Sequence, residues 1–199
     1  IKGYQSFKDK RIKYKNPDPE AFRDTYNLRS YLKIIQDFQN GSLSFTPYVR
    51  YTDMDFKMHF LPGKPLEQNS HKSIGLQTMY QGSINNHFIT VGVDLEMTEG
   101  ELNEFQTAPD VSFGPRLAYP NGDHYDYNVE SKIIAAFVNF EWNQTEKTKL
   151  VTGIRGEKVD YEYETNITPG IKGRIQVAPN RNDDFTEFSP KLAINHKIN

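Results

Sequence analysis

Histidine, aspartate and glutamate are the residue types in this sequence that could support metal binding or acid–base chemistry. The five histidines lie at positions 59, 71, 87, 124 and 196. Their spacing does not produce a metal-binding pattern such as H-E-x-x-H, so the sequence predicts no metal site. Asp94 and Glu96 would share one strand face and could act as a carboxylate pair, but we interpret them as solvated polar residues. No glycine-rich phosphate-binding loop is present, and we predict neither an enzyme nor a resident cofactor.

A segment that combines tyrosines, acids and a histidine is the strongest candidate for ligand binding. Its sequence is Tyr119-Pro-Asn-Gly-Asp-His-Tyr-Asp-Tyr127, and we expect it to be a loop. Aromatic rings that stack and polar groups that form hydrogen bonds are typical of sites for polar ligands. The candidate ligand-binding residues are His59, Tyr119, Asp123, His124, Tyr125 and Tyr127. A surface loop that packs only on itself is the alternative.

Composition excludes several classes of protein. A formal net charge of −2 disfavours nucleic-acid wrapping and a polybasic membrane patch. The absence of cysteine excludes disulfides, zinc knuckles and thiol nucleophiles. No apolar run approaches the roughly 18 residues of a spanning helix. An aromatic content of 13% is nevertheless high for a chain whose mean hydropathy is −0.73.

Apolar and polar residues alternate with a period of two in most of the chain. Between His87 and Thr98, the residues Ile89, Val91, Val93, Leu95 and Met97 fall on one side, and polar residues fall on the other. Such a segment is a β-strand with one oily and one polar face. Similar alternation predicts strands in the segments 26–34, 42–60, 73–80, 134–142, 154–163 and 188–195. The apolar parity changes after Tyr51 and after Ile154, which either a β-bulge or a change of environment would explain.

Short and long connections alternate between these strands. Short polar turns are predicted at 39–41, 82–86 and 143–147, and longer irregular segments at 61–70, 107–127 and 165–184. In an up-and-down meander, this order places every short turn at one end of the sheet and every long loop at the other.

Two architectures fit the alternation: a soluble β-sandwich or small barrel, and an outer-membrane barrel whose oily face contacts lipid. Strands of about twenty residues and the asymmetry between turns and loops favour the membrane barrel. Aromatic residues near the short turns are typical of interface girdles, namely Phe38, Tyr80, Phe88 and Trp142. Pro47 and Pro190 are expected at membrane edges or bulges, because proline lacks a ladder donor. We predict an all-β fold, an antiparallel up-and-down meander that forms part of a large transmembrane barrel.

The second half of the chain carries motifs of a known family. The motifs are Phe140-Glu-Trp-Asn143, then Leu150-x-x-Gly-x-Arg-x-Glu157, then Phe188-Ser-Pro-Lys-Leu192. In this order they resemble the barrel of TonB-dependent outer-membrane receptors, and the resemblance extends from about Tyr26 to the end. Residues 1–25 match none of the motifs and could form a loop or, over Tyr4–Lys15, an eighth strand.

The resemblance implies a 22-stranded barrel in the bacterial outer membrane, with an N-terminal plug domain and energy supplied by the TonB complex. Residues 1–199 would then be a partial barrel domain of about seven strands, an internal piece without the plug. Open edges in lipid leave backbone groups unpaired, so such a piece could not span a membrane alone. Arg50, Asp94, Glu96 and Arg155 are expected to face the lumen and to contact the plug.

The resemblance also implies a substrate class. Ferric siderophores are the commonest cargo of the family, so uptake of a ferric siderophore is the expected function. No residue distinguishes that cargo from heme, a vitamin or an oligosaccharide. Two alternatives stay open: a secreted or surface β-sandwich that binds carbohydrate, and a small closed barrel in which residues 1–25 pair with the last strand.

Overall fold

A single antiparallel sheet forms most of the computed structural model, which describes residues 8, 9, 11 and 18–198. Its strands are β1 (Arg23–Tyr31), β2 (Ile34–Phe38), β3 (Gly41–Lys57), β4 (Leu66–Ile84), β5 (His87–Gln106), β8 (Gly122–Asn143), β9 (Thr148–Thr165) and β12 (Arg181–His196). Two small hairpins complete the fold, β6 (Val111–Phe113) with β7 (Arg116–Tyr119), and β10 (Gly170–Lys172) with β11 (Ile175–Val177). The strand order β1-β3-β4-β5-β8-β9-β12 confirms the predicted meander.

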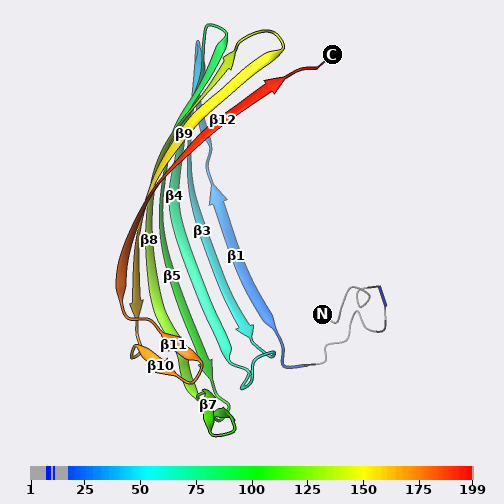
Figure 1. Cartoon of the computed structure of the whole chain (residues 1–199), viewed down its shortest axis with the longest axis vertical. Helices are drawn as coiled ribbons and strands as arrows, with labels where there is room; N and C mark the ends of the chain where they lie inside the picture. Colours follow the sequence, from blue (N-terminus) through cyan, green and yellow to red (C-terminus); the bar gives the residue numbers. More distant parts are fainter. Residues whose placement is uncertain (1–7, 10, 12–17, 199) are drawn as a thin grey trace.

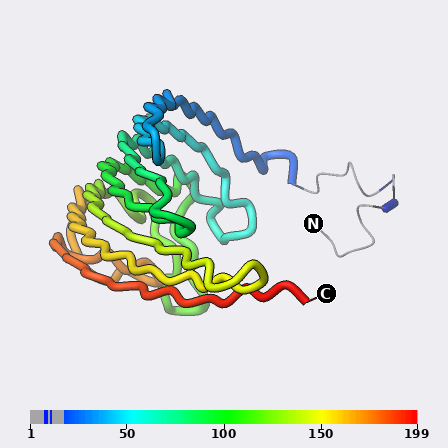
Figure 2. The backbone as a smooth tube through the Cα atoms, turned by 90° about the horizontal axis from the view of Figure 1, so that it is seen from above, coloured from blue at the N-terminus to red at the C-terminus, as the bar shows by residue number. Residues whose placement is uncertain are grey.

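The sheet is curved like part of a cylinder wall, as the view from above shows (Figure 2). β1 and β12 lie at its two edges, and among the described strands β12 pairs only with β9. These strands therefore do not close into a small barrel on their own. The expected strand at Tyr4–Lys15 lies almost entirely outside the described residues.

Turns and loops separate to opposite ends of the sheet, as predicted (Figure 1). The turn end carries the connections at 39–40, 85–86 and 144–147, and the loop end carries those at 58–65, 107–121 and 166–180. The two hairpins belong to the loop end. The predicted bounds of the long loops are wrong: residues 66–70, 122–127 and 181–184 are the first residues of β4, β8 and β12, because the strands extend further than the alternation indicated.

One face of the sheet, which we call the outer face, is apolar and uncovered. Val91, Val93 and Leu95 of β5 are 41%, 41% and 38% exposed, and Ile74 and Ile134 on the flanking strands are 62% and 60% exposed. Apart from glycines, the buried apolar residues of the described part are Met58, Pro65, Ala118, Pro120, Ala135, Ile175 and Val177. Within the described residues, no second sheet packs on this face, which the β-sandwich alternative would require. None of the described helical segments has the length and apolar character to cross a membrane.

The predicted strand at 26–34 is interrupted, and Pro47 provides the reason. β1 and β2 both pair with β3, and the gap between them lies opposite this proline. Leu32 N donates a 3.1 Å hydrogen bond to Pro47 O, but proline has no N–H with which to return one. The ladder therefore lapses for two residues and resumes at Ile34. On its other side, Pro47 pairs with Leu76 of β4 in unbroken register, and Pro190 pairs with Ile154 of β9 in the same way, so neither proline marks a bulge.

The two changes of apolar parity are changes of environment. Pairing stays in register along all of β3–β4 and β8–β9, so no bulge reverses the side chains. Met54, Phe56, Tyr161 and Tyr163 therefore lie on the opposite, inner face near the loop end. The one irregularity in the large sheet falls between Glu104 and Phe105.

The aromatic residues near the turns divide between the faces. Trp142 shares the outer face with His87, whose ring meets it edge-on at 6.2 Å between centroids. Phe88 was expected in the same girdle, but it is paired with Glu141 on the inner face, and Lys149 Nζ lies 5.9 Å from its ring. Phe88 is therefore not part of the outer girdle.

The uncovered apolar face leads to a first prediction. Val93→Lys places a charge near the middle of the outer face, and in a bilayer it should lower the free energy of unfolding by about 2–4 kcal/mol. Gln77→Lys is the matched control, because Gln77 pairs with Asp94 on the inner face at the same height. Urea titration of the protein in lipid vesicles measures both. Equal effects of the two lysines would contradict the assignment of the faces.

Candidate functional site

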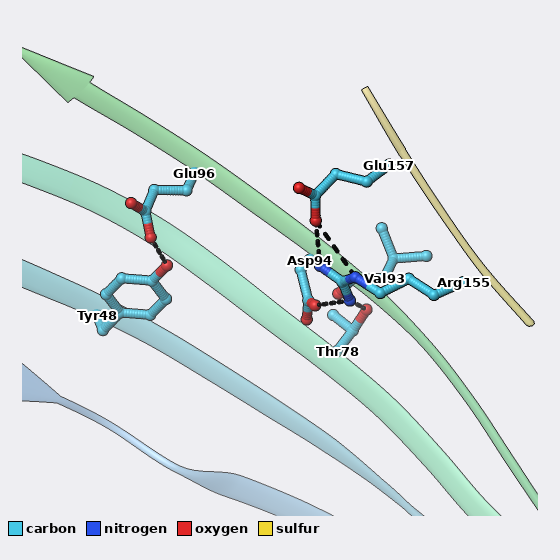
Figure 3. A network of polar contacts seen from close by, with 7 residues as sticks. All are labelled: Tyr48, Thr78, Val93, Asp94, Glu96, Arg155 and Glu157. Carbon is cyan, nitrogen blue, oxygen red and sulfur yellow. Dashed lines mark hydrogen bonds and ion pairs between the residues drawn. The ribbon is translucent and has the colours of Figure 1, made fainter. Parts of the chain in front are cut away.

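The inner face carries a network of charged and phenolic groups (Figure 3). The Tyr48 hydroxyl and the Arg50 guanidinium, both on β3, donate hydrogen bonds to the Glu96 carboxylate on β5. Thr98 Oγ1 donates a third, at 3.1 Å. The side chains of Tyr48 and Arg50 reach across the whole width of β4 to Glu96. Such bridges form readily on the concave side of a curved sheet, where side chains from alternate strands converge.

A second cluster lies on the same face, between β5 and β9. Arg155 Nη1 is 2.6 Å from Asp94 Oδ2, and Arg155 Nη2 is 2.8 Å from Glu157 Oε2 (Figure 3). Charge-assisted bonds of this length are among the stronger hydrogen bonds in proteins. All three side chains are about one quarter to one third exposed, so they line the wall without being covered by it.

Small residues make these long reaches possible. Tyr48 lies flat over Gly75, where a Cβ would overlap the phenol ring, and Phe137 lies over Gly92 in the same manner. Ala135, at 1% exposure, lies between Asp94 and Glu157 in the pairing across β8. The sequence reasoning found Arg50, Asp94, Glu96 and Arg155 but missed the roles of Tyr48 and Glu157. The sequence did contain one signal: glycines on the inner face, such as Gly75 and Gly92, lie opposite large side chains on the neighbouring strands.

The predicted lumen residues are thus brought together in two clusters on one face. The clusters contain three carboxylates and two guanidiniums, and Arg50 Nε is buried without a hydrogen-bond partner. Unpaired buried donors are uncommon in folded proteins. The arrangement suits contact with water or with a second polar surface.

A buried histidine anchors the connection between β5 and β8. His124 is 0% exposed, with Nδ1 at 2.8 Å from Glu104 Oε1 and Nε2 at 2.8 Å from the carbonyl oxygen of Pro120. Its ring also lies beside that of Tyr119, at 6.3 Å between centroids. In this structure, both ring nitrogens of His124 are therefore engaged in holding the loop end together.

Gln106 and Asn121 fasten the same connection. Gln106 is 1% exposed, and its Nε2 donates to the carbonyl oxygen of Pro109 at 2.9 Å. Asn121 Nδ2 lies 3.0–3.1 Å from the carbonyl oxygens of Gln106, Thr107 and Ala108. The predicted ligand loop is therefore a rigid, self-bonded structure. Asn121 lies within the segment predicted to bind ligand but was not among its candidate residues, and Gln106 lies outside that segment.

Arg174 joins the two hairpins of the loop end. Its backbone N–H donates a 2.8 Å hydrogen bond to Ala118 O, next to Tyr119 in β7. Its guanidinium lies over the rings of Phe113 and Tyr119, at 5.3 and 6.0 Å from their centroids. The β6–β7 and β10–β11 hairpins consequently behave as one unit. Nothing in the sequence pointed to Arg174, because its partners are more than fifty residues away.

A pocket of about 250 Å³ lies between these connections. It is lined by Pro120, Asp123, His124, the segment 167–172, Ile175 and Val177. Asp123 is exposed and Lys172 lies on the same pocket, so the pocket offers one carboxylate and one ammonium. Of the predicted ligand residues, Asp123 is the one placed at an accessible polar position here.

Tyr125 and Tyr127 begin the inner wall immediately next to the loop end. The Tyr127 ring lies 5.0 Å from that of Tyr163. Burial raises the pKa of the Tyr127 phenol, with smaller contributions from Tyr161 and Tyr163. The phenol is thus neutral at ordinary pH and can donate a hydrogen bond. Together these tyrosines make the inner wall aromatic near the loop end, whereas its middle is charged.

His59 lies apart from the other candidates, on the 58–65 connection. It is exposed, and its ring meets that of Phe60 edge-on at 5.7 Å. The same connection is fastened by Lys64, 3.1 Å from Asp18 and 3.2 Å from Glu20, and this ammonium lowers the pKa of the Asp18 carboxyl. Within the described residues, no group of three or more histidines and carboxylates is arranged to hold a metal ion.

Comparison with protein families identifies the barrel. Residues 3–199 match the family model described as "TonB dependent receptor-like, beta-barrel". The chain belongs to the TonB-dependent receptor family. This family consists of bacterial outer-membrane transporters and not of enzymes, which confirms the predicted localisation and fold class. No characterised protein sequence matches the chain significantly.

Solved receptors share the fold at low sequence identity. The siderophore receptor PiuA from Acinetobacter baumannii is 14% identical, with a TM-score of 0.62 over 89% of this chain and 31% of that one. The open form of the ferric-catecholate import receptor Fiu from E. coli K12 is 13% identical, with a TM-score of 0.57, covering 88% and 33%. The copper transporter OprC is 14% identical, with a TM-score of 0.58, covering 90% and 28%. The chain thus spans a third or less of these receptors.

A second prediction concerns the glycine beneath Tyr48. Gly75→Val should displace the Tyr48 ring from Glu96 and destabilise the receptor by about 1–3 kcal/mol, as overpacking does. Gly100→Val is the matched control on the inner face of β5, because a Cβ there would meet nothing closer than 3.6 Å. Thermal unfolding in detergent compares the two. An equal loss in both variants would show that the Tyr48 contact does not depend on Gly75.

A third prediction concerns the buried pair His124 and Glu104. Removing one partner leaves the other polar group buried and unpaired, so each alanine variant should open the 107–121 connection to protease. The double variant should be less damaged than the sum of the two single variants, by about 0.5–3 kcal/mol. Limited proteolysis and thermal unfolding report the two quantities. Strict additivity would mean that the pair is not coupled.

Proposed function

We propose that the receptor containing this chain imports a ferric siderophore. Three similar structures carry names of this class: ferric-catecholate receptor Fiu, siderophore receptor PiuA and the ferric yersiniabactin receptor FyuA from Yersinia pestis. Others are named for ferric citrate and copper, so the names rank siderophores first without excluding other chelates. The observation that carries the proposal is the group of tyrosines on the inner wall, next to the hydrogen-bonded loop end.

Ligand capture is assigned to the tyrosines and the neighbouring pocket. Tyr125 and Tyr127 offer rings and phenol hydroxyls on the inner face, next to Tyr161 and Tyr163 on β9. Asp123 at the pocket adds a charged contact. A planar or ring-bearing chelate with polar substituents would stack on such rings and accept hydrogen bonds from the phenols. Tyr119 and His124 then act by positioning the loop, and His59 would contact only a ligand that extends to the 58–65 connection.

The charged middle of the inner wall is assigned to the plug domain of the parent protein. Arg50, Asp94, Glu96 and Arg155 lie where a plug inside the barrel would contact the wall. Arg50 Nε is a donor without a partner, and a carboxylate or carbonyl of the plug would satisfy it. Energy from the TonB complex would act through that plug.

A fourth prediction tests ligand capture. Tyr125→Ala and Tyr127→Ala should each weaken binding of a ferric siderophore about three- to tenfold, the value of one aromatic stacking contact. Tyr26→Ala is the control, because Tyr26 lies on the outer face, opposite Asp53 of β3. Uptake of radioactive iron by cells that express the full receptor measures the effect, over a panel of catecholate, hydroxamate and citrate chelates. Uptake of copper or of an iron-free solute, with no ferric chelate transported, would overturn the proposed substrate class.

A further inference from the structure

A groove opens on the outer face, at the loop-end limit of the apolar surface. It has a volume of about 370 Å³ and crosses β1, β3, β4, β5 and β8. Its apolar floor consists of Leu28, Val49, Ile74 and Met97, which are 49%, 45%, 62% and 54% exposed. These side chains lie on one face, because Leu28 is the pairing neighbour of Tyr51, and Ile74 pairs with both Val49 and Met97. The floor is long and oily enough to hold part of an alkyl chain.

Lysines stand on the loop-end side of this floor. Lys72 and Lys132 line the groove, and Lys158 lies on the same face of β9, where it pairs with Ile134 of β8. Lys72 follows Ile74 on the same face, and Lys132 follows Ile134, each two residues nearer the loop end. Their side chains are 66%, 56% and 52% exposed in the order Lys72, Lys132, Lys158. A lysine at the edge of an apolar surface lays its methylenes on that surface and extends its ammonium to the polar boundary.

The ion pairs of these lysines leave the ammonium groups available. Lys72 lies 2.7 Å from Glu99, Lys158 lies 2.8 Å from Asp160, and Lys132 lies 3.9 Å from Glu130. All six side chains are more than half exposed, and pairs of this kind contribute about 0–1 kcal/mol. A doubly charged phosphate can therefore compete for the ammonium groups.

The order of residue types along the strands also sets where an anion would sit. On β8 the outer face runs from Ile134 to Lys132 to Glu130, and on β9 from Gly156 to Lys158 to Asp160. The lysines lie between the apolar surface and the acids. An anion attached to an acyl chain meets the lysines at the junction of chain and headgroup, before it reaches the carboxylates. At the turn end, the same face finishes in Phe38, Tyr80 and Trp142.

We propose that this groove binds a phosphate-bearing lipid of the loop-side leaflet. One acyl chain lies along Leu28, Val49, Ile74 and Met97, and its headgroup phosphate lies between Lys72 and Lys132. Lys158 contacts the phosphate of an adjacent lipid. The proposal depends on the orientation of the outer face toward lipid and is independent of the transported cargo.

The test uses the full-length receptor, purified in detergent with a chelator present so that divalent cations cannot bridge phosphates to Glu99 or Glu130. Native mass spectrometry counts the bound molecules of a phosphorylated glycolipid and of the same glycolipid after phosphatase treatment. The wild-type receptor should retain the phosphorylated form preferentially. With about 1 kcal/mol per lysine near a membrane surface, Lys72→Gln should weaken retention about fivefold and the double variant with Lys132→Gln about 25-fold.

The control is the double variant Lys147→Gln and Lys197→Gln at the turn end, where Lys197 N donates to Lys147 O at 2.9 Å. It removes the same charge and should leave lipid retention unchanged. The midpoint of thermal unfolding in detergent should be the same in both double variants and the wild-type receptor, which verifies that each is folded. Equal retention of the two glycolipids by the wild-type receptor, or equal losses in the two double variants, would overturn the proposal. Displacement of the lipid by millimolar inorganic phosphate would also overturn it, because it would reveal a site for a free anion only.

Discussion

An apolar sheet face with nothing packed on it is the constraint on which the rest of this structure depends. Side chains such as Ile74 and Val93 are 62% and 41% exposed, and no second layer of the described residues covers them. Leaving apolar surface in water costs about 25 cal/mol per Å², so a face of this size requires an apolar solvent. Lipid is the environment that supplies it, since closed barrels satisfy the backbone as well. The short turns, the long loops and the aromatic girdle at Trp142 are consequences of that one requirement.

The inner face is constrained differently from the outer one, because it must be polar and yet closely packed. Gly75 and Gly92 allow Tyr48 and Phe137 to lie flat, so that charged groups on alternate strands meet. Arg155 reaches Asp94 in this manner across β8. Because the paired side chains lie close against the sheet, they leave room for another domain in the lumen and offer it defined hydrogen-bond partners. Toward the loop end, the wall becomes aromatic, where a ligand would first meet it.

The sequence predicted the features that depend on local alternation. Ile89 to Met97 were placed on one face correctly, and the order of short turns and long loops was confirmed. It did not reveal features that depend on distant partners. The gap between β1 and β2 arises from Pro47 on the neighbouring strand, and the burial of His124 arises from Glu104, twenty residues away. Phe88 was assigned to the outer face because it lies near a turn. Its position in the alternation along β5, one residue before Ile89, places it on the inner face.

A cysteine scan along β5 tests the central claim most directly, because the chain has no native cysteine to remove. Nitroxide labels are placed singly at positions 89 to 98 of the receptor in lipid vesicles, and their collision rates with oxygen and with a water-soluble nickel complex are compared. The account predicts a period of two, with oxygen-accessible labels at Ile89, Val91, Val93, Leu95 and Met97 and the reverse at the intervening positions. Uniform access of the nickel complex to both sets would show that the apolar face meets water, and would contradict the account.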